Sequence, residues 1–170
     1  MMKGCGLMKQ GRIRIMAILL VLCLTVSFTP TVRAAGEVCR IGPVLYMTLG
    51  DALFAAVDGD TIQLLTDIDY NHGLTFVEKD ITFDLNGYNL NVENSTGNGL
   101  FANNSIVSIT GGGEFNVSGT TRGVQALLGA SVTVTSAHAT SPSGIGVYAV
   151  VASQVTVEAD VTATGEDGLG

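Results

Sequence analysis

Apolar and polar residues alternate along most of the chain after residue 60, a pattern typical of β-strands that bury one face. Residues 81–85 and 88–92 show it most clearly, with an apolar side chain at every second position on both sides of Asn86-Gly87. Because side chains two residues apart lie on the same face of a strand, both segments are predicted to be strands with one buried and one exposed face. Residues 60–65 follow the same rule.

Asn86-Gly87, between these two strands, is compatible with two local structures. Asn-Gly flanked by alternating segments is the strongest short-range indication of a β-hairpin, because both residues tolerate the positive φ angles of a tight turn. The same dipeptide can also turn a corner between two strands of a larger coil. The repeat that follows it favours the corner.

The second half of the chain repeats one unit three times. Gly99, Gly123 and Gly146 open the three copies, at steps of 24 and 23 residues. Each opening leads to a second short strand, and these strands are Val107-Ser108-Ile109, Val132-Thr133-Val134 and Val155-Thr156-Val157. Ile81-Thr82-Phe83 precedes the first of them by 26 residues, and a further copy begins at Gly168-Leu169.

A repeat of this length, made of short strands and turns without a helical pattern, predicts a β-solenoid. One unit is too small to bury its own apolar face, whereas parallel stacking joins the apolar residues of successive coils into one core. The fold class is therefore predicted to be all-β, a parallel β-helix of about five coils over residues 60–170, each adding about 4.8 Å. Because the chain stops as another unit opens, we expect an uncapped C-terminal end and a fragment of a longer protein.

A single helix is predicted at residues 48–57, within an N-terminal region of residues 35–59 that also contains a strand. Thr48 and Asp51 have the spacing of a capping-box variant, and Gly59 stands where a helix would end. The residues expected on its apolar face are Leu49, Leu53, Ala56 and Val57. We expect this face to cover the open end of the first coil, as terminal caps do in repeat proteins.

Residues 1–34 have the features of a secretory signal peptide. Basic residues precede an apolar run over residues 15–28, and Val32-Arg33-Ala34 offers small or β-branched side chains where a signal peptidase reads the sequence. The run is shorter than the roughly 20 apolar residues that span a bilayer. We therefore expect cleavage before Ala35 and a mature chain that is secreted or associated with the cell wall, with no membrane contact.

The mature chain is predicted to be strongly acidic. Without residues 1–34 it keeps three basic residues, Arg40, Lys79 and Arg122, against 15 acidic residues, a net charge of −12. This charge repels nucleic-acid phosphates and anionic lipids, and no cluster of Lys and Arg counteracts it, which disfavours both partners. Cys39 is the only cysteine after residue 34, so no internal disulfide forms, and we expect it to be partly buried under the cap.

Three stretches occur in a fixed order between residues 46 and 88. They are Tyr46-Met47-Thr48-Leu49-Gly50-Asp51-Ala52-Leu53, Asp58-Gly59-Asp60-Thr61-Ile62-Gln63-Leu64-Leu65-Thr66-Asp67-Ile68 and Ile81-Thr82-Phe83-Asp84-Leu85-Asn86-Gly87-Tyr88. Together with residues 38–42 they resemble the amino-terminal coils of pectate-lyase-like right-handed parallel β-helix domains, which are common in secreted and cell-surface proteins of Gram-positive bacteria. The resemblance implies right-handed coils, a corner at Asn86-Gly87, and a structural or adhesive module that binds extracellular polysaccharide or a surface protein.

The alternative function is a fragment of a polysaccharide lyase or glycoside hydrolase of the same fold. A lyase would combine calcium-binding carboxylates with a basic residue, yet Arg40, Lys79 and Arg122 are not grouped with acids in the sequence. A hydrolase needs two or three carboxylates about 5 to 9 Å apart, and Asp67 with Asp69, or Asp80 with Asp84, would project from one strand face. We prefer the non-catalytic role and assign no catalytic residue.

Metal and cofactor sites receive little support from the sequence. The candidate ligands for a loosely bound Ca²⁺ are Asp58, Asp60, Asp67 and Asp69. His72 and His138 have no Cys, Asp or Glu at the spacing of a zinc site. We therefore assign no cofactor-binding or metal-ligating residue.

Overall fold

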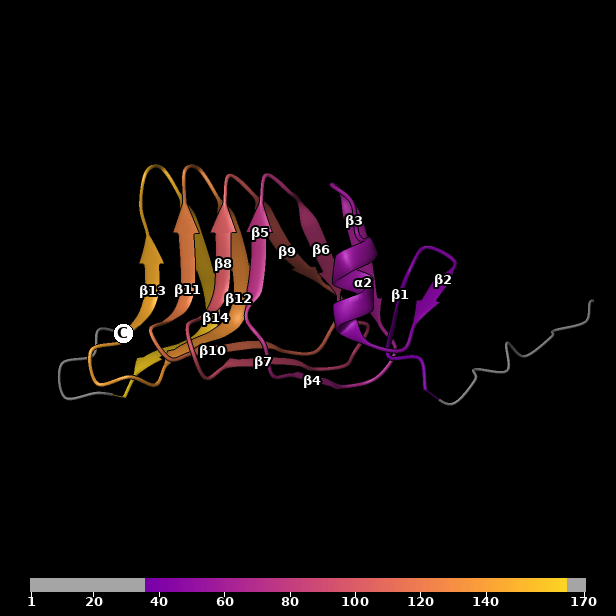
Figure 1. Ribbon diagram of the computed structural model, residues 1–170, viewed down its shortest axis with the longest axis horizontal. Helices are drawn as coiled ribbons and strands as arrows, with labels where there is room; N and C mark the ends of the chain where they lie inside the picture. Colours follow the sequence, from indigo (N-terminus) through magenta and orange to yellow (C-terminus); the bar gives the residue numbers. More distant parts are fainter. Residues whose placement is uncertain (1–35, 165–170) are drawn as a thin grey trace, which may run out of the picture. The chain divides into compact units, whose positions relative to one another are not determined.

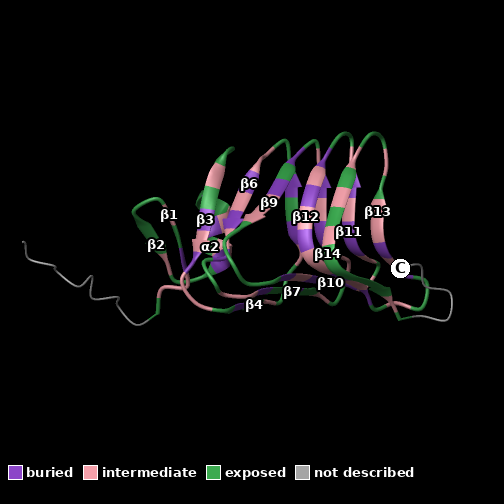
Figure 2. Ribbon diagram, turned by 180° about the vertical axis from the view of Figure 1, so that it is seen from behind, coloured by how far each residue is buried: buried purple, intermediate pink, exposed green. Residues whose placement is uncertain are grey.

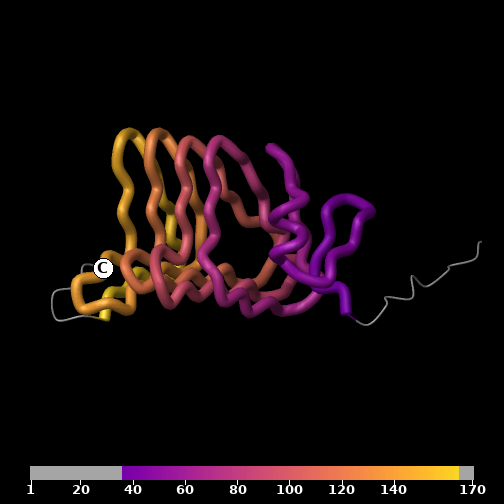
Figure 3. Tube along the Cα trace, viewed as in Figure 1, coloured from indigo at the N-terminus to yellow at the C-terminus, as the bar shows by residue number. Residues whose placement is uncertain are grey.

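The computed structural model describes residues 36–164 (Figure 1). The predicted signal segment, residues 1–34, and the repeat opening at Gly168-Leu169 lie outside the described residues. The described part is a parallel β-helix with one short helix near its N-terminal end, as the sequence predicted. Figure 3 shows the successive coils lying side by side along the stack.

Strands of successive coils form three faces. The first face contains β3 (Asp60–Leu64), β6 (Ile81–Asp84), β9 (Ile106–Thr110) and the first parts of β12 (Ser131–Ala139) and β14 (Gln154–Ala163). The second face contains β4 (Ile68–Tyr70), β7 (Leu90–Asn94), β10 (Phe115–Gly119) and the later parts of β12 and β14. The third face contains β5 (Leu74–Val77), β8 (Asn98–Asn103), β11 (Arg122–Leu127) and β13 (Ile145–Ala149).

The first two faces join into one sheet because β12 and β14 are long enough to turn a corner. β12 pairs with β9 at Ser131 and Val132, and with β10 from Ser136 onward. The register of β12 against β14 shifts between Val134 and Ser136, where the strand bends. Bulges of this kind let a strand bend without losing its pairing on either side.

The repeat predicted from the sequence is the register of the stack. Val107 lies opposite Ile81 in one neighbouring coil and opposite Val132 in the other, and Val132 lies opposite Val155. On the third face, Val124 pairs with Leu100 and Val147. Residues 60–164 contain four complete coils and β14, the strand that opens a fifth.

Asn86-Gly87 turns a corner, so the hairpin alternative is wrong. β6 and β7, on its two sides, do not pair with each other: β6 pairs with β3 and β9, and β7 with β4 and β10. Both corner residues have positive φ angles, 51° for Asn86 and 85° for Gly87, which Asn and Gly tolerate better than other residues. The Asn86 side-chain amide donates to the Leu64 carbonyl 3.2 Å away, which ties this corner to the preceding coil.

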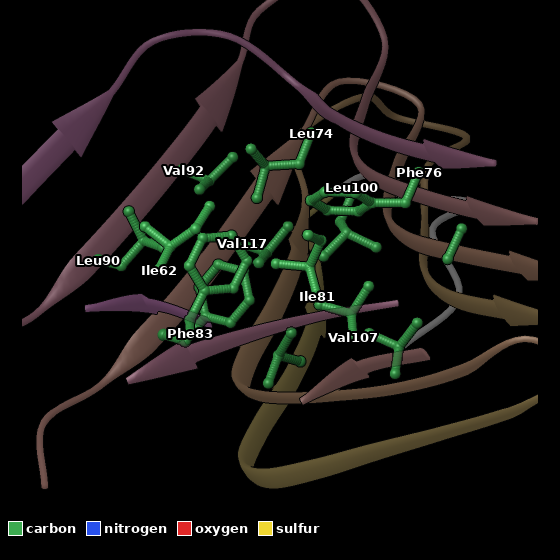
Figure 4. Close-up of a cluster of buried hydrophobic side chains, with 14 of the residues drawn as sticks. Ile62, Leu74, Phe76, Ile81, Phe83, Leu90, Val92, Leu100, Val107 and Val117 are labelled. Carbon is green, nitrogen blue, oxygen red and sulfur yellow. The ribbon is translucent and has the colours of Figure 1, made fainter. Parts of the chain in front are cut away.

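The core runs through the centre of the coils and is filled from all three faces. Phe76 of the third face, Phe83 of the first and Phe115 of the second are buried, and the Phe83 and Phe115 ring centroids lie 5.2 Å apart. Figure 4 shows Phe76 and Phe83 among the aliphatic side chains of neighbouring coils, and Figure 2 shows buried positions alternating with more exposed ones along the strands. The alternation in the sequence therefore corresponds to the inside and outside of the coil.

The N-terminal cap consists of β1 (Cys39–Ile41), β2 (Val44–Tyr46) and α2 (Leu49–Ala55). Thr48 is the N-cap of α2: its hydroxyl accepts from the Asp51 N–H at 3.1 Å and donates to the Asp51 carboxylate at 2.7 Å. β1 pairs antiparallel with β3 and so covers the edge of the first face.

The buried face of α2 differs from the prediction at two positions. Leu49 and Ala56 are buried as expected, but Ala52 is also fully buried, and Val57 is 63% exposed. The physical reason is that the helix ends at Ala55 and the C-cap residue Ala56 is extended, with a ψ of 135°, so the chain leaves the helical path before Val57. Cys39, expected to be partly buried under the cap, is fully buried and belongs to the cap strand β1.

Candidate binding face

The three basic residues weighed for lyase chemistry lie in different parts of the fold. The Arg40 guanidinium donates to the Gln63 side chain at 2.6 Å on the first face, and the Lys79 ammonium donates to the Ala56 carbonyl at 2.8 Å. The Arg122 guanidinium lies 4.7 Å from the centre of the Tyr148 ring on the third face. Each is therefore engaged with an uncharged partner, and the structure does not bring them to one site.

The acidic residues weighed for hydrolase chemistry accept hydrogen bonds that hold coils together. Asp80 accepts from the Ile106 N–H at 2.7 Å, and Asp84 accepts from the Gln63 side chain. Asp67 accepts from the Asn89 N–H at 2.8 Å, and Asp69 from the Asn91 amide at 2.9 Å. These bonds explain the positions of the carboxylates by coil stacking alone.

The four candidate calcium ligands do not form one group. Asp58 and Asp60 lie before and at the start of β3, and they accept from the Asp80 and Val57 N–H groups. Asp67 and Asp69 follow β3, which has five residues and is therefore about 16 Å long. Within residues 36–164 no three His, Cys, Asp or Glu side chains are close enough to hold a metal ion.

A hollow of about 580 Å³ lies between the cap and the second face. It is lined by Val38 and residues 47–50 of the cap, and by residues 67–72, which contain β4. It exists because β1 covers the edge of β3 only, while β4 is the last strand of its sheet and pairs only with β7.

Apolar and polar groups occupy different positions in this hollow. Leu49 and Ile68 are buried, whereas Asp67, Asp69 and His72 are exposed. The rings of Tyr70 and His72 lie 5.5 Å apart at an angle of 47°. An apolar recess of this size with a few polar groups at its rim is typical of a small-ligand site.

A column of bonded polar side chains leads away from the hollow along the second face. The Asn91 amide donates to Asp69 at 2.9 Å, the Asn116 amide donates to Asn91 at 3.1 Å, and the Ser136 hydroxyl donates to Asn116 at 2.6 Å. The four residues occupy matching positions in successive strands. We call them the amide column.

Two smaller recesses lie along the amide column. One of about 190 Å³ is lined by Asn71, Glu93 and Ser95, and one of about 210 Å³ includes Asn91, Asn116 and His138 in its lining. Amides, hydroxyls and carboxylates thus follow each other along the whole second face, and the lining of these three recesses contains no Lys or Arg. This arrangement suits non-covalent binding of a long ligand rich in hydroxyl groups.

Sequence reasoning did not identify Tyr70, Asn91 or Asn116 as site residues. The alternation places Asn91 outward, and Asn116 falls 25 residues later, so the repeat contains a signal for the column. No signal in the sequence indicates the hollow, because it depends on where the cap ends against the first coil.

Comparisons with known proteins found no family model, no curated protein and no solved structure that matches the chain. Among residues 36–164, no helix is both long enough and apolar enough to cross a membrane.

Proposed function

We propose that this chain is an exported, non-catalytic β-helix module that binds an extended glycan along its second face. The observation that carries the proposal is the hollow of about 580 Å³, which opens at the end of the amide column on the same face. One sugar ring in the hollow would contact Leu49, Ile68 and the Tyr70 ring through its apolar side. Its neighbours would meet hydrogen-bonding groups in each successive coil.

Placement outside the cell is part of the same proposal. It is supported by the signal-like features of residues 1–34 and by the resemblance of residues 46–88 to pectate-lyase-like domains of Gram-positive surface proteins. It is tested by expressing the full chain in a Gram-positive host, fractionating medium, wall and cytosol, and determining the N-terminal residue of the protein. We expect the medium or wall fraction and a chain beginning at Ala35, and an uncleaved cytosolic chain would contradict export.

Binding is tested by incubating the purified chain with plant, bacterial and host polysaccharides, with and without calcium. Both retention of the protein and release of new sugar ends are recorded. We expect retention without release. Release of reducing or unsaturated ends would instead support the alternative, an enzyme fragment, and would overturn the non-catalytic role.

The location of the site is tested with surface variants in the first coil. His72→Ala and Asn71→Ala remove exposed groups at the hollow, and we expect them to weaken retention about tenfold, or roughly 1.4 kcal/mol. Thr61→Ala, an exposed residue of the same coil on the first face, is the matched control and should bind as the parent does. Equal weakening by all three variants would remove the second face from consideration.

A further inference from the structure

The two carboxylates at the rim of the hollow, those of Asp67 and Asp69, carry the same negative charge. Each uses only one carboxylate oxygen, Oδ1, to accept a bond from the neighbouring coil. Among residues 36–164, no donor bonds the second oxygen of either carboxylate, Oδ2, so in this part of the chain both Oδ2 atoms are available to a ligand. The backbone N–H of Asn89 and the side-chain amide of Asn91 therefore hold the two carboxylates in place without neutralising them.

No Lys or Arg of the described residues compensates these two carboxylates. Arg40, Lys79 and Arg122 are the three Lys and Arg residues after residue 35, and they are engaged at Gln63, Ala56 and Tyr148. None of them lines the hollow. A ligand carboxylate placed there would meet two fixed like charges without a counter-charge, whereas a ligand ammonium would form charge-assisted hydrogen bonds.

We infer that the hollow recognises sugars that carry protonated amino groups, in preference to neutral sugars, and that it excludes uronates. The inference rests on the proposed function, because it names the class of glycan that the same site takes. The apolar floor binds the ring, and the free Oδ2 atoms of Asp67 and Asp69 accept from the ammonium group. N-acetylation removes the charge and two of the three donors of the ammonium, so an acetylated chain loses this contribution.

The test compares three short oligosaccharides by calorimetry: oligomers of glucosamine, of N-acetylglucosamine and of galacturonate. They are measured at a pH where the amine is protonated, at low and at physiological salt. We expect the glucosamine oligomer to bind at least about tenfold more tightly than its acetylated counterpart. The galacturonate oligomer should show no binding.

Charge-matched variants separate recognition at the hollow from general attraction to an acidic protein. The double variant Asp67→Asn with Asp69→Asn keeps the acceptors for Asn89 and Asn91 but removes both charges at the rim. The double variant Glu158→Gln with Asp160→Asn removes two charges from β14, outside the hollow. We expect the first variant to bind both glucosamine forms equally and the second to keep the preference of the parent.

The possible failures are distinguishable. Equal binding of the acetylated and free-amine oligomers, an equal loss in both double variants, or binding of galacturonate overturns the inference and leaves the proposed glycan-binding function standing. Absence of binding to every oligosaccharide overturns the proposed function itself. Tighter binding of a short lysine peptide than of any sugar overturns the inference in favour of a basic protein partner.

Discussion

The first and second faces are built from the same coils, yet their outward side chains behave differently. The first face carries a central column of hydroxyls, one in each coil: Thr61, Thr82, Ser108, Thr133 and Thr156. None of these five hydroxyls takes part in a hydrogen bond within residues 36–164. On the second face, the amide column from Asp69 to Ser136 is bonded from coil to coil.

Side-chain geometry accounts for the difference. Successive coils lie about 4.8 Å apart, and hydroxyl oxygens that stack in register keep that separation, which exceeds the roughly 2.8 Å of a hydrogen bond. An amide carries a donor on one side and an acceptor on the other, so the gap between stacked amides falls to hydrogen-bond length. A repeated residue in register therefore stabilises the stack only when its functional group can span the coil spacing.

The N-terminal edges of the two faces, next to the cap, also differ. β1 continues the first face beyond β3, whereas β4 leaves the second face open at the hollow. The first face thus has a closed edge and an unbonded column, and the second has a bonded column that ends at a recess. This contrast supports the proposal that a ligand binds at the second face.

The largest expected effect comes from the core that both faces share. Phe83→Ala removes a fully buried ring of the first face and should lower the free energy of unfolding by about 3 to 5 kcal/mol, as should Phe115→Ala on the second face. Because the two rings are in contact, the double variant should lose less than the sum of the single losses. Chemical denaturation measures all three, and strict additivity would show that each face has its own core.

The next effect concerns the corner that connects the two faces in the third coil. Gly113 has a φ of 116°, and a Cβ atom there would lie 2.0 Å from the Tyr88 carbonyl oxygen. Gly113→Ala should therefore destabilise the chain by about 2 kcal/mol or more, because the backbone would have to shift. Gly112→Ala is the matched control, since a Cβ at Gly112 meets nothing within 4 Å, and thermal unfolding of both variants measures the difference.

A smaller effect compares the two columns directly with substitutions that keep side-chain shape. Asn116→Leu removes the bonds to Asn91 and Glu114 and the bond from Ser136, and should lower the free energy of unfolding by about 1 to 2 kcal/mol. Thr133→Val removes an unbonded hydroxyl and should change it by less than about 0.5 kcal/mol. Equal losses in denaturant titrations would contradict the distinction between the bonded and the unbonded column.

The last effect is zero at neutral pH, appears only above pH 9 and concerns the edge of the first face that β1 covers. Burial, with a smaller contribution from the Asp51 carboxylate, raises the pKa of the Cys39 thiol from 9.0 to about 11. The folded chain therefore keeps this proton between pH 9 and 11 while the unfolded chain releases it, so the contribution of this thiol to stability is constant below pH 9 and falls as pH rises toward 11. Cys39→Ala should abolish this dependence.

The same thiol reports whether the closed edge opens. In the folded chain, Cys39 should react with a thiol reagent at pH 8 only as fast as β1 detaches or the chain unfolds. Labelling followed by mass spectrometry, with and without denaturant, measures this. Rapid labelling without denaturant would show that β1 does not protect the edge.

The sequence by itself was sufficient for the coils, their register and the cap helix. The alternation around Ile81-Thr82-Phe83 and its return at Val107-Ser108-Ile109 predict which residues stack, because a slip of one residue would expose the buried side chains. Thr48 and Asp51 predict the start of α2 for a similarly local reason, since a cap forms between residues three positions apart. The local sequence did not distinguish a corner from a hairpin at Asn86-Gly87. The repeat was needed to choose the corner.

Only the tertiary structure decided the features that depend on distances between coils. The side chains of Asn91 and Asn116 form a hydrogen bond, whereas those of Thr82 and Ser108 do not. This difference follows from the spacing between coils, which no single segment of the sequence encodes. The hollow forms because β1 pairs with the edge of β3 but leaves the edge of β4 uncovered. The pairing of β1 with β3 joins residues that are far apart in the chain. Local patterns thus determine the strands and their order, and packing across coils determines the surface on which a ligand could bind.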